Sequence, residues 1–229
     1  MRTPISTLQR LAVSTILAVV LSACAIGRSV IEVSPPASAT SGGIAAVKIA
    51  VKITEVRDLR RFSINPRDPS QPSLGDAAEI NDPKVTARAV GRKRGGFGAA
   101  LGDVTVPEGT TVAGLVREAA RTAMQDKGYR IVGETSPDYA AALPLALDVE
   151  EFWAWFTPGF VSVTASFKTR VIMTGGPLVR SAREAVDAGA SRSVIAVTEA
   201  VWTDVIQTGL VDLVAKMKEQ IRAPSEIPR

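Results

Sequence analysis

Hydrophobic and polar residues alternate in three long parts of the chain, and this period of two predicts β-strands with one buried face. In the first part, Val51 and Ile53 lie on one face and Lys52 lies on the other. The other two parts flank Pro158-Gly159, a turn sequence, and therefore predict an antiparallel hairpin. The three long strands are expected at residues 46–56, 143–156 and 160–174. Shorter strands are expected at residues 84–90, 103–107, 129–132 and 178–190.

Apolar residues recur every three to four positions in two further segments, a spacing that predicts amphipathic helices. The first helix is expected over residues 112–128, where the hydroxyl of Thr110 or Thr111 can cap the start. The second is expected over residues 198–221. Gly209 lowers the helix propensity in the middle of this second segment.

The order of these elements predicts an α+β fold, a mixed or antiparallel sheet of about five to six strands covered on one face by two helices. We expect one globular domain over residues 44–222, followed by a disordered tail at 223–229. Residues 57–83 contain several prolines and are expected to form a long polar loop. Its arginines are expected to be solvated, with contact to an anion as the alternative: Arg57, Arg60, Arg61 and Arg67.

The start of the chain has the pattern of a bacterial lipoprotein signal. A short stretch with Arg2 and Arg10 precedes an apolar run that is too short to span a bilayer. The run ends in Leu21-Ser22-Ala23-Cys24, which contains the only cysteine of the chain and fits a lipobox. We therefore expect residues 1–23 to be a signal peptide that is removed, and Cys24 to carry the lipid that attaches the protein to a membrane.

The residues that follow Cys24 indicate the compartment. In a Gram-negative bacterium, Ala25 rather than Asp at the second mature position is typical of sorting to the outer membrane, with the domain facing the periplasm. Residues 24–43 are rich in Ser, Pro, Ala and Gly and predict a flexible tether. The alternative for residues 30–33, which are apolar except for one glutamate, is docking on the domain as an extended piece.

The composition excludes several classes of chemistry. The chain has no histidine, which removes Ser-His-Asp triads, Cys-His dyads and Cys/His zinc sites. Without Arg2 and Arg10, the 27 basic residues become 25 against 23 acidic ones, which leaves a formal charge of +2. This balance gives no indication of nucleic-acid binding. We expect no metal, no cofactor and no catalytic residues.

The first candidate contact with a partner is a glycine-rich stretch at residues 91–98. It places Arg92, Lys93 and Arg94 among four glycines, with Phe97 as the one aromatic residue. Glycines permit tight turns and close backbone approach. The stretch therefore predicts the tip of a β-hairpin or, alternatively, a loop that binds an anion or a protein partner.

The second candidate contact is the aromatic end of the strand expected at residues 143–156. It contains Trp153 and Trp155, flanked by two phenylalanines. Three interpretations are open: these side chains form core, they form an exposed patch for a protein partner, or they dip into the membrane.

Several short motifs, taken in order along the mature chain, resemble the YajG-type envelope lipoproteins. The resemblance rests on the lipobox, Ile31-Glu32-Val33-Ser34-Pro35, the glycine-rich turn from Val90 to Gly98, Asp103-Val104, and Lys127-Gly128-Tyr129 at the end of a helix. The chain departs from the family at Gly95, where Asn is usual, and at Phe97, where Tyr is usual; residues 57–83 are also longer. The resemblance implies a periplasm-facing lipoprotein with no established activity and no catalytic residues.

The sequence thus favours a non-enzymatic, lipid-anchored outer-membrane lipoprotein that serves as an accessory module for an envelope protein complex or for the cell wall (peptidoglycan). One alternative is a carrier of a lipid or another small apolar ligand, with the aromatic residues lining a groove. A second is a glycan hydrolase that uses Asp148, Glu150 and Glu151, because glycosidases need two carboxyl groups about 5–9 Å apart.

Overall fold

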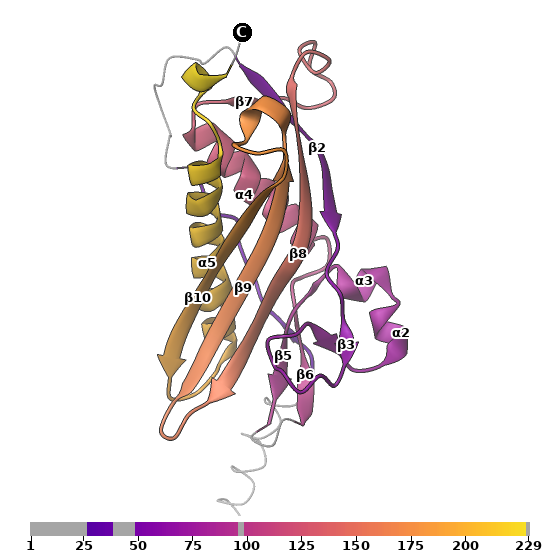
Figure 1. Cartoon of the computed structure of the whole chain (residues 1–229). Coiled ribbons are helices and arrows are strands. Elements are labelled where there is room, and N and C mark those ends of the chain that lie inside the picture. Colours follow the sequence, from indigo (N-terminus) through magenta and orange to yellow (C-terminus); the bar gives the residue numbers. More distant parts are fainter. Residues whose placement is uncertain (1–26, 39–48, 96–98, 228–229) are drawn as a thin grey trace, which may run out of the picture.

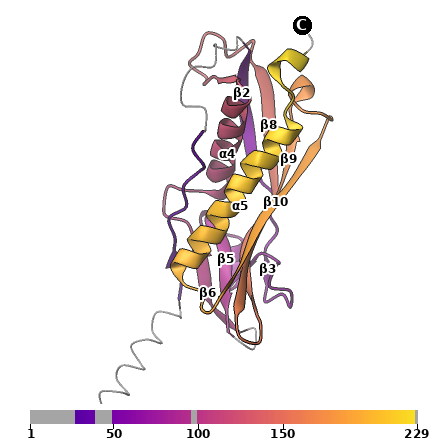
Figure 2. The ribbon, with the colours of Figure 1, turned by 90° about the vertical axis from the view of Figure 1, so that its left-hand side faces the viewer.

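The computed structural model describes residues 27–38, 49–95 and 99–227, and the predicted α+β fold class is confirmed. An eight-stranded mixed sheet forms one layer, and the helices α4 (Val112–Asp126) and α5 (Glu199–Gln220) cover one of its faces (Figures 1 and 2). Two of the eight strands have only two residues each, and one of these, β1, lies in the segment for which a tether was expected. The strands are β1 (Ser29–Val30), β2 (Ala50–Asp58), β5 (Ala89–Arg94), β6 (Ala100–Thr105), β7 (Arg130–Ile131), β8 (Leu143–Pro158), β9 (Val163–Thr174) and β10 (Glu184–Val194).

The 16-residue strand β8 organises the sheet. Along one edge it pairs antiparallel with β9, and β9 in turn pairs with β10, as the hairpin pattern predicts. Along its other edge two strands follow one another, both parallel to β8: β2 pairs with the first half, and β5 pairs with the second half through Gly91 and Ala154. The sheet therefore forks into a β2-β7 branch and a β5-β6-β1 branch.

A β-bulge in β8 decides which aromatic side chains face the helices. The register with β9 shifts between Val149 and Glu151. Before the bulge, Leu147 and Val149 point into the helix-covered core, and after it Phe152 takes this place. Because the extra residue changes the alternation, Trp153 belongs to a separate buried cluster on the opposite side.

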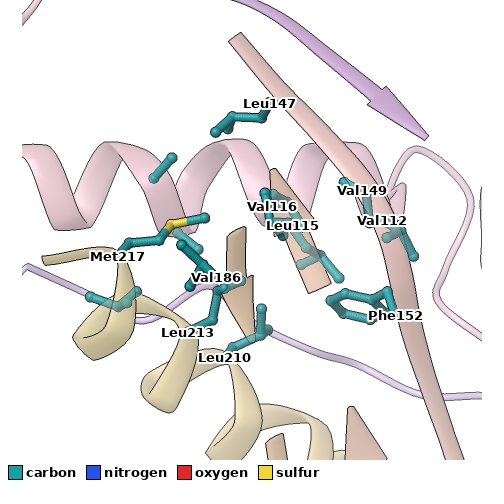
Figure 3. Packing of buried hydrophobic residues seen from close by; sticks show 14 of the residues in the cluster. Val112, Leu115, Val116, Leu147, Val149, Phe152, Val186, Leu210, Leu213 and Met217 are labelled. Atoms are coloured by element: carbon teal, nitrogen blue, oxygen red, sulfur yellow. The ribbon is translucent and has the colours of Figure 1, made fainter. Parts of the chain in front are cut away.

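The main core lies between the sheet and the two helices. In Figure 3, Leu115 and Val116 of α4 lie toward the side chains of β8, and Leu213 of α5 lies beside Val186 of β10. Helix α4 begins where the sequence predicts, since the Thr111 hydroxyl accepts a hydrogen bond from the amide of Gly114 at 3.0 Å. Within the described residues, no helix is both long enough and apolar enough to cross a membrane.

Gly209 has a packing role in α5. A Cβ atom at this position would lie 2.1 Å from Cδ1 of Phe167 in β9. The glycine that lowers helix propensity thus lets α5 approach the sheet closely. A second close approach joins α5 to the sheet edge, where the amide of Gly189 in β10 donates to the carboxylate of Asp212 at 3.0 Å.

The polar segment between β2 and β5, here called the insert (residues 59–88), is more ordered than the predicted loop. It lies on the sheet face opposite the helices (Figure 1). The strand expected at residues 84–90 is wrong for its first half, because residues 84–86 belong to a helix. Prolines and aspartates explain this, because Asp82 caps a helix whose first residue is Pro83. The elements of the insert are β3 (Ser63–Ile64), β4 (Ser73–Leu74), α2 (Ala77–Ile80) and α3 (Pro83–Thr86).

The predicted tether is wrong for residues 27–38, here called the N-terminal strap. Its strand β1 pairs parallel with β6, and the side chains of Ile31 and Val33 are buried in the main core. The strap is further held by Thr122, whose hydroxyl donates to the carbonyl of Pro36 at 2.8 Å. The segment docks because Ile31 and Val33, at alternate positions, are apolar and can be buried together. The Ser/Pro-rich residues around them led to the prediction of a flexible tether. The rest of the tether, including Cys24, lies outside the described residues.

The disordered tail predicted at residues 223–229 is wrong for its described part. Residues 224–226 form the short helix η2 (Pro224–Glu226), and the amide of Ala223 donates to Oε2 of Glu226 at 2.8 Å. Just before it, the amide of Arg222 donates to the carbonyl of Leu178 in η1 (Gly176–Leu178) at 2.9 Å. The bond from Arg222 attaches the segment after α5 to the turn between β9 and β10.

Candidate functional site

The glycine-rich stretch forms the β5–β6 hairpin, as one of its two interpretations predicts. Beside this hairpin and the insert lies an open pocket of about 610 Å³, here called the arginine pocket. Among the described residues, the charged side chains that line it are three arginines. The lining consists of Asn65, Pro66, Arg67, Gly75, Arg92, Arg94, Ala99 and Ala100.

The hairpin holds two arginines in this pocket because β5 is fixed tightly against β8. A Cβ atom at Gly91 would lie 2.8 Å from the carbonyl oxygen of Ala154, so only glycine permits the observed spacing. Arg92 and Arg94 then line the pocket two positions apart. Lys93, between them, instead donates from Nζ to the carbonyl of Gly27 at 3.2 Å.

Arg92 is buried and incompletely paired. Its side chain is only 5% exposed, and its Nη1 atom is buried without a hydrogen-bond partner. The nearest carboxylate belongs to Asp103, whose Oδ1 lies 3.9 Å from Nε of Arg92 and also lacks a hydrogen-bond partner. Burial raises the pKa of Asp103, although the charge of Arg92 acts in the opposite direction. Arg92 therefore has an unused hydrogen-bonding capacity inside the protein.

Arg94 adds a second guanidinium to the same pocket. It is held from two sides of the insert, by the carbonyl of Pro66 at 2.8 Å from Nη1 and by the hydroxyl of Ser73 at 3.2 Å from Nη2. Burial lowers the pKa of Arg94, and the positive charge of Arg92 lowers it further. Arg92 and Arg94, with exposed Arg67 at the same pocket, place three positive charges together, an arrangement whose chemistry suits an anion.

The two tryptophans proposed as contacts have other surroundings. Trp153 is only 1% exposed and is covered by the insert, where the ring of Phe62 meets it edge-on at 5.9 Å. Its indole Nε1 donates to the carbonyl of Pro69 at 3.3 Å. Trp155, half-buried, packs against the same cluster. The proposal of Trp153 as an exposed contact is wrong, and the core interpretation is confirmed for this residue. Phe97 lies outside the described residues.

Arg60 is a key residue of the insert, and the expectation that its side chain is solvated is wrong. Its side chain is fully buried, and it donates to the carbonyls of Ala89 at 2.6 Å, Thr86 at 2.7 Å and Phe152 at 3.2 Å. A salt bridge with Asp58 at 2.7 Å balances its charge. Arg60 thus joins the insert to β5 and β8. An arginine in a proline-rich polar stretch carries no sequence signal for this role.

The three acidic residues considered for hydrolysis are all in ion pairs. Asp148 is buried and accepts two hydrogen bonds from Arg57, at 2.6 and 2.8 Å. Glu151 pairs with Lys168 at 3.0 Å. Glu150 lies 3.8 Å from Arg170 and is separated from Asp148 by the bulge. These ion pairs join neighbouring strands on the sheet face opposite the helices. They lend no support to a catalytic pair of carboxyl groups for glycan hydrolysis.

Metal binding also finds no support in the part of the chain that the structure describes, because no group of three His, Cys, Asp or Glu side chains comes together there. The arginine pocket is therefore the feature with the clearest chemistry. It unites two of the residues proposed from sequence, Arg92 and Arg94, with Arg67 of the insert. The chain matches no family model, and it has no significant match among curated proteins.

Proposed function

We propose that this protein is a non-enzymatic lipoprotein, anchored by lipid on Cys24 to the outer membrane and facing the periplasm. In this proposal it acts as an accessory module that binds an anionic group of an envelope protein complex or of the cell wall. The lipobox and the resemblance to YajG-type lipoproteins support the anchor and the compartment. The arginine pocket supports the contact.

The observation that carries the contact is the buried, incompletely paired guanidinium of Arg92 beside Arg94. Leaving a buried charged group without its hydrogen bonds costs on the order of 1–3 kcal/mol or more. A carboxylate or phosphate offers the paired acceptors that a guanidinium fits best. Binding an anion would therefore offset a cost that is already present in the free protein.

The contact is tested by photo-cross-linking in cells from a photoreactive residue in place of Ala99, which is exposed at the pocket. We expect a discrete adduct that is lost with Arg67→Gln and Arg94→Gln combined. Arg61→Gln is the matched control, because Arg61 is an exposed arginine of the same insert that does not line the pocket. A protein adduct identifies an accessory subunit, and a peptidoglycan adduct identifies the cell wall as partner. An adduct unaffected by the double variant refutes the pocket as the contact.

The anchor is tested separately. Growth with labelled palmitate should label the protein, and Cys24→Ser should abolish both the label and the recovery of the protein with the outer membrane. Retention of the label in the variant would refute lipidation at this residue.

A further inference from the structure

The N-terminal strap leaves little slack between the proposed lipid and the folded domain. Only Ala25 and Ile26 separate Cys24 from Gly27, whose amide already donates to the carbonyl of Leu101 in β6 at 2.7 Å. Three residue steps span at most about 11 Å. A lipid on Cys24 therefore holds the membrane surface within about this distance of the start of β6.

The register of the sheet shows which other parts lie at this end. β5 runs parallel to β8, with Gly91 opposite Ala154, so that the end of β5 and the end of β8 point the same way. β6 begins at that end, and its residue Leu101 binds Gly27 there. The turn between β8 and β9 follows directly, at Gly159–Ser162. Figures 1 and 2 both show this turn and the β5–β6 hairpin at the same end of the molecule.

Three large apolar side chains are exposed at this end, and together they are called the apolar tip. Phe160 and Val161 in the β8–β9 turn are 104% and 79% exposed, and Ile195 is 91% exposed. Ile195 lies beside the turn, because its neighbour Val194 pairs with Val163. Each other exposed large apolar residue of the described chain keeps close to half of its surface covered, at 47–54% exposure. Exposed apolar groups gathered in one place mark a binding surface.

Resting on the proposed lipid anchor, we propose that the apolar tip inserts into the same membrane leaflet as a second, non-covalent attachment. Adjacent strands lie about 4.8 Å apart, so the β8–β9 turn is offset sideways from the strap by roughly 15 Å, across β6, β5 and β8. A bilayer that the lipid holds at the strap is then within reach of the tip. Lys93 beside Gly27 adds a cation at the level where lipid phosphates lie. A bilayer fits these observations better than a protein partner, because the anchor brings it to this end.

Attachment at both the lipid and the apolar tip would fix the orientation of the domain relative to the membrane. Strand β8 then ends at the membrane and β9 begins there. The opposite end, with η1, η2 and the connection from β7 to β8, faces the periplasm (Figure 1). A lipid anchor alone would let the domain rotate about the strap.

The test uses the full lipidated protein with Phe160→Cys, reconstituted in vesicles of phosphatidylethanolamine and phosphatidylglycerol. Because the lipid occupies the only native thiol, an environment-sensitive fluorophore attaches at position 160 alone. Thr135→Cys is the matched control, since Thr135 is exposed in the connection from β7 to β8 at the opposite end. We expect a blue-shifted emission at position 160, quenching by spin-labelled lipid and loss of quenching by aqueous iodide, with the reverse at position 135.

Equal iodide quenching at both positions overturns the proposal and leaves the apolar tip as a contact for a protein. Mass spectrometry of the starting material separates this failure from a failure of the anchor. If Cys24 proves unmodified, the proposed lipoprotein function and the tip insertion are both overturned. If Cys24 carries lipid and position 160 stays in water, only the tip insertion is overturned.

Discussion

Replacing Gly209 by alanine tests whether packing or helix propensity decides the stability of this fold. In the interior of a helix, Gly→Ala normally stabilises by about 1 kcal/mol. Here the new methyl group would lie 2.1 Å from Cδ1 of Phe167, well inside van der Waals contact. The two effects have opposite signs, so the measured sign distinguishes them.

The magnitude follows from how little Phe167 can move. Its ring is 2% exposed and meets the ring of Phe152 edge-on, with centroids 4.8 Å apart. Overpacking a fixed core costs about 1–3 kcal/mol, and this contact lies at the upper end because the ring has no free space to enter. After subtraction of the propensity gain, we expect Gly209→Ala to lower the free energy of unfolding by about 1–2 kcal/mol.

Urea unfolding followed by tryptophan fluorescence measures this change, because Trp153 and Trp202 are buried and report on both sides of the sheet. A double-mutant cycle with Phe167→Leu isolates the contact: the smaller side chain should reduce the cost of Gly209→Ala. A variant that is more stable than the wild type by about 1 kcal/mol would refute the close approach of α5 and β9.

Three further predictions concern other parts of the fold. Gly102→Ala should detach the strap, because its Cβ would meet the carbonyl of Gly27; faster amide exchange at residues 27–31 is the readout, and unchanged exchange contradicts it. Burial raises the pKa of Tyr129 to about 12, so the folded state keeps the proton that an unfolded tyrosine loses near pH 10. Stability should therefore fall as pH rises from about 10 to 12, by roughly 2–3 kcal/mol, and Tyr129→Phe should remove this fall in pH-dependent urea midpoints. Arg60→Met should destabilise by about 3–5 kcal/mol, since it removes the salt bridge of Asp58 and the guanidinium that donates to three carbonyls; a loss as small as that of Arg61→Met would contradict its role.

The sequence predicted those elements whose cause is local. The alternation around Pro158-Gly159 and the cap at Thr111 depend on neighbouring residues, and both appear in the structure. The β-bulge at Val149 could not be predicted, because nothing in the local pattern shows an extra residue, yet it alone moves Trp153 from one side of the sheet to the other.

The candidate site was predicted in part for the same reason. Arg92 and Arg94 stood out because they lie among glycines in the chain. Arg67 joins them only through the packing of the insert on the hairpin, and the burial of Arg60 depends on carbonyls that are distant in sequence. Long-range contacts of this kind leave no periodic signal.

The hydrogen bond from the amide of Gly189 to Asp212 has a consequence for contacts between copies of this protein. An edge strand presents free amides with which the edge strand of a second copy can pair. The 11-residue edge strand β10 has one of these amides occupied by α5, while β1 and β7, which end the two branches of the sheet, have two residues each. The bond therefore interrupts the row of free amides along β10 and makes this edge a poorer template for pairing with a second copy.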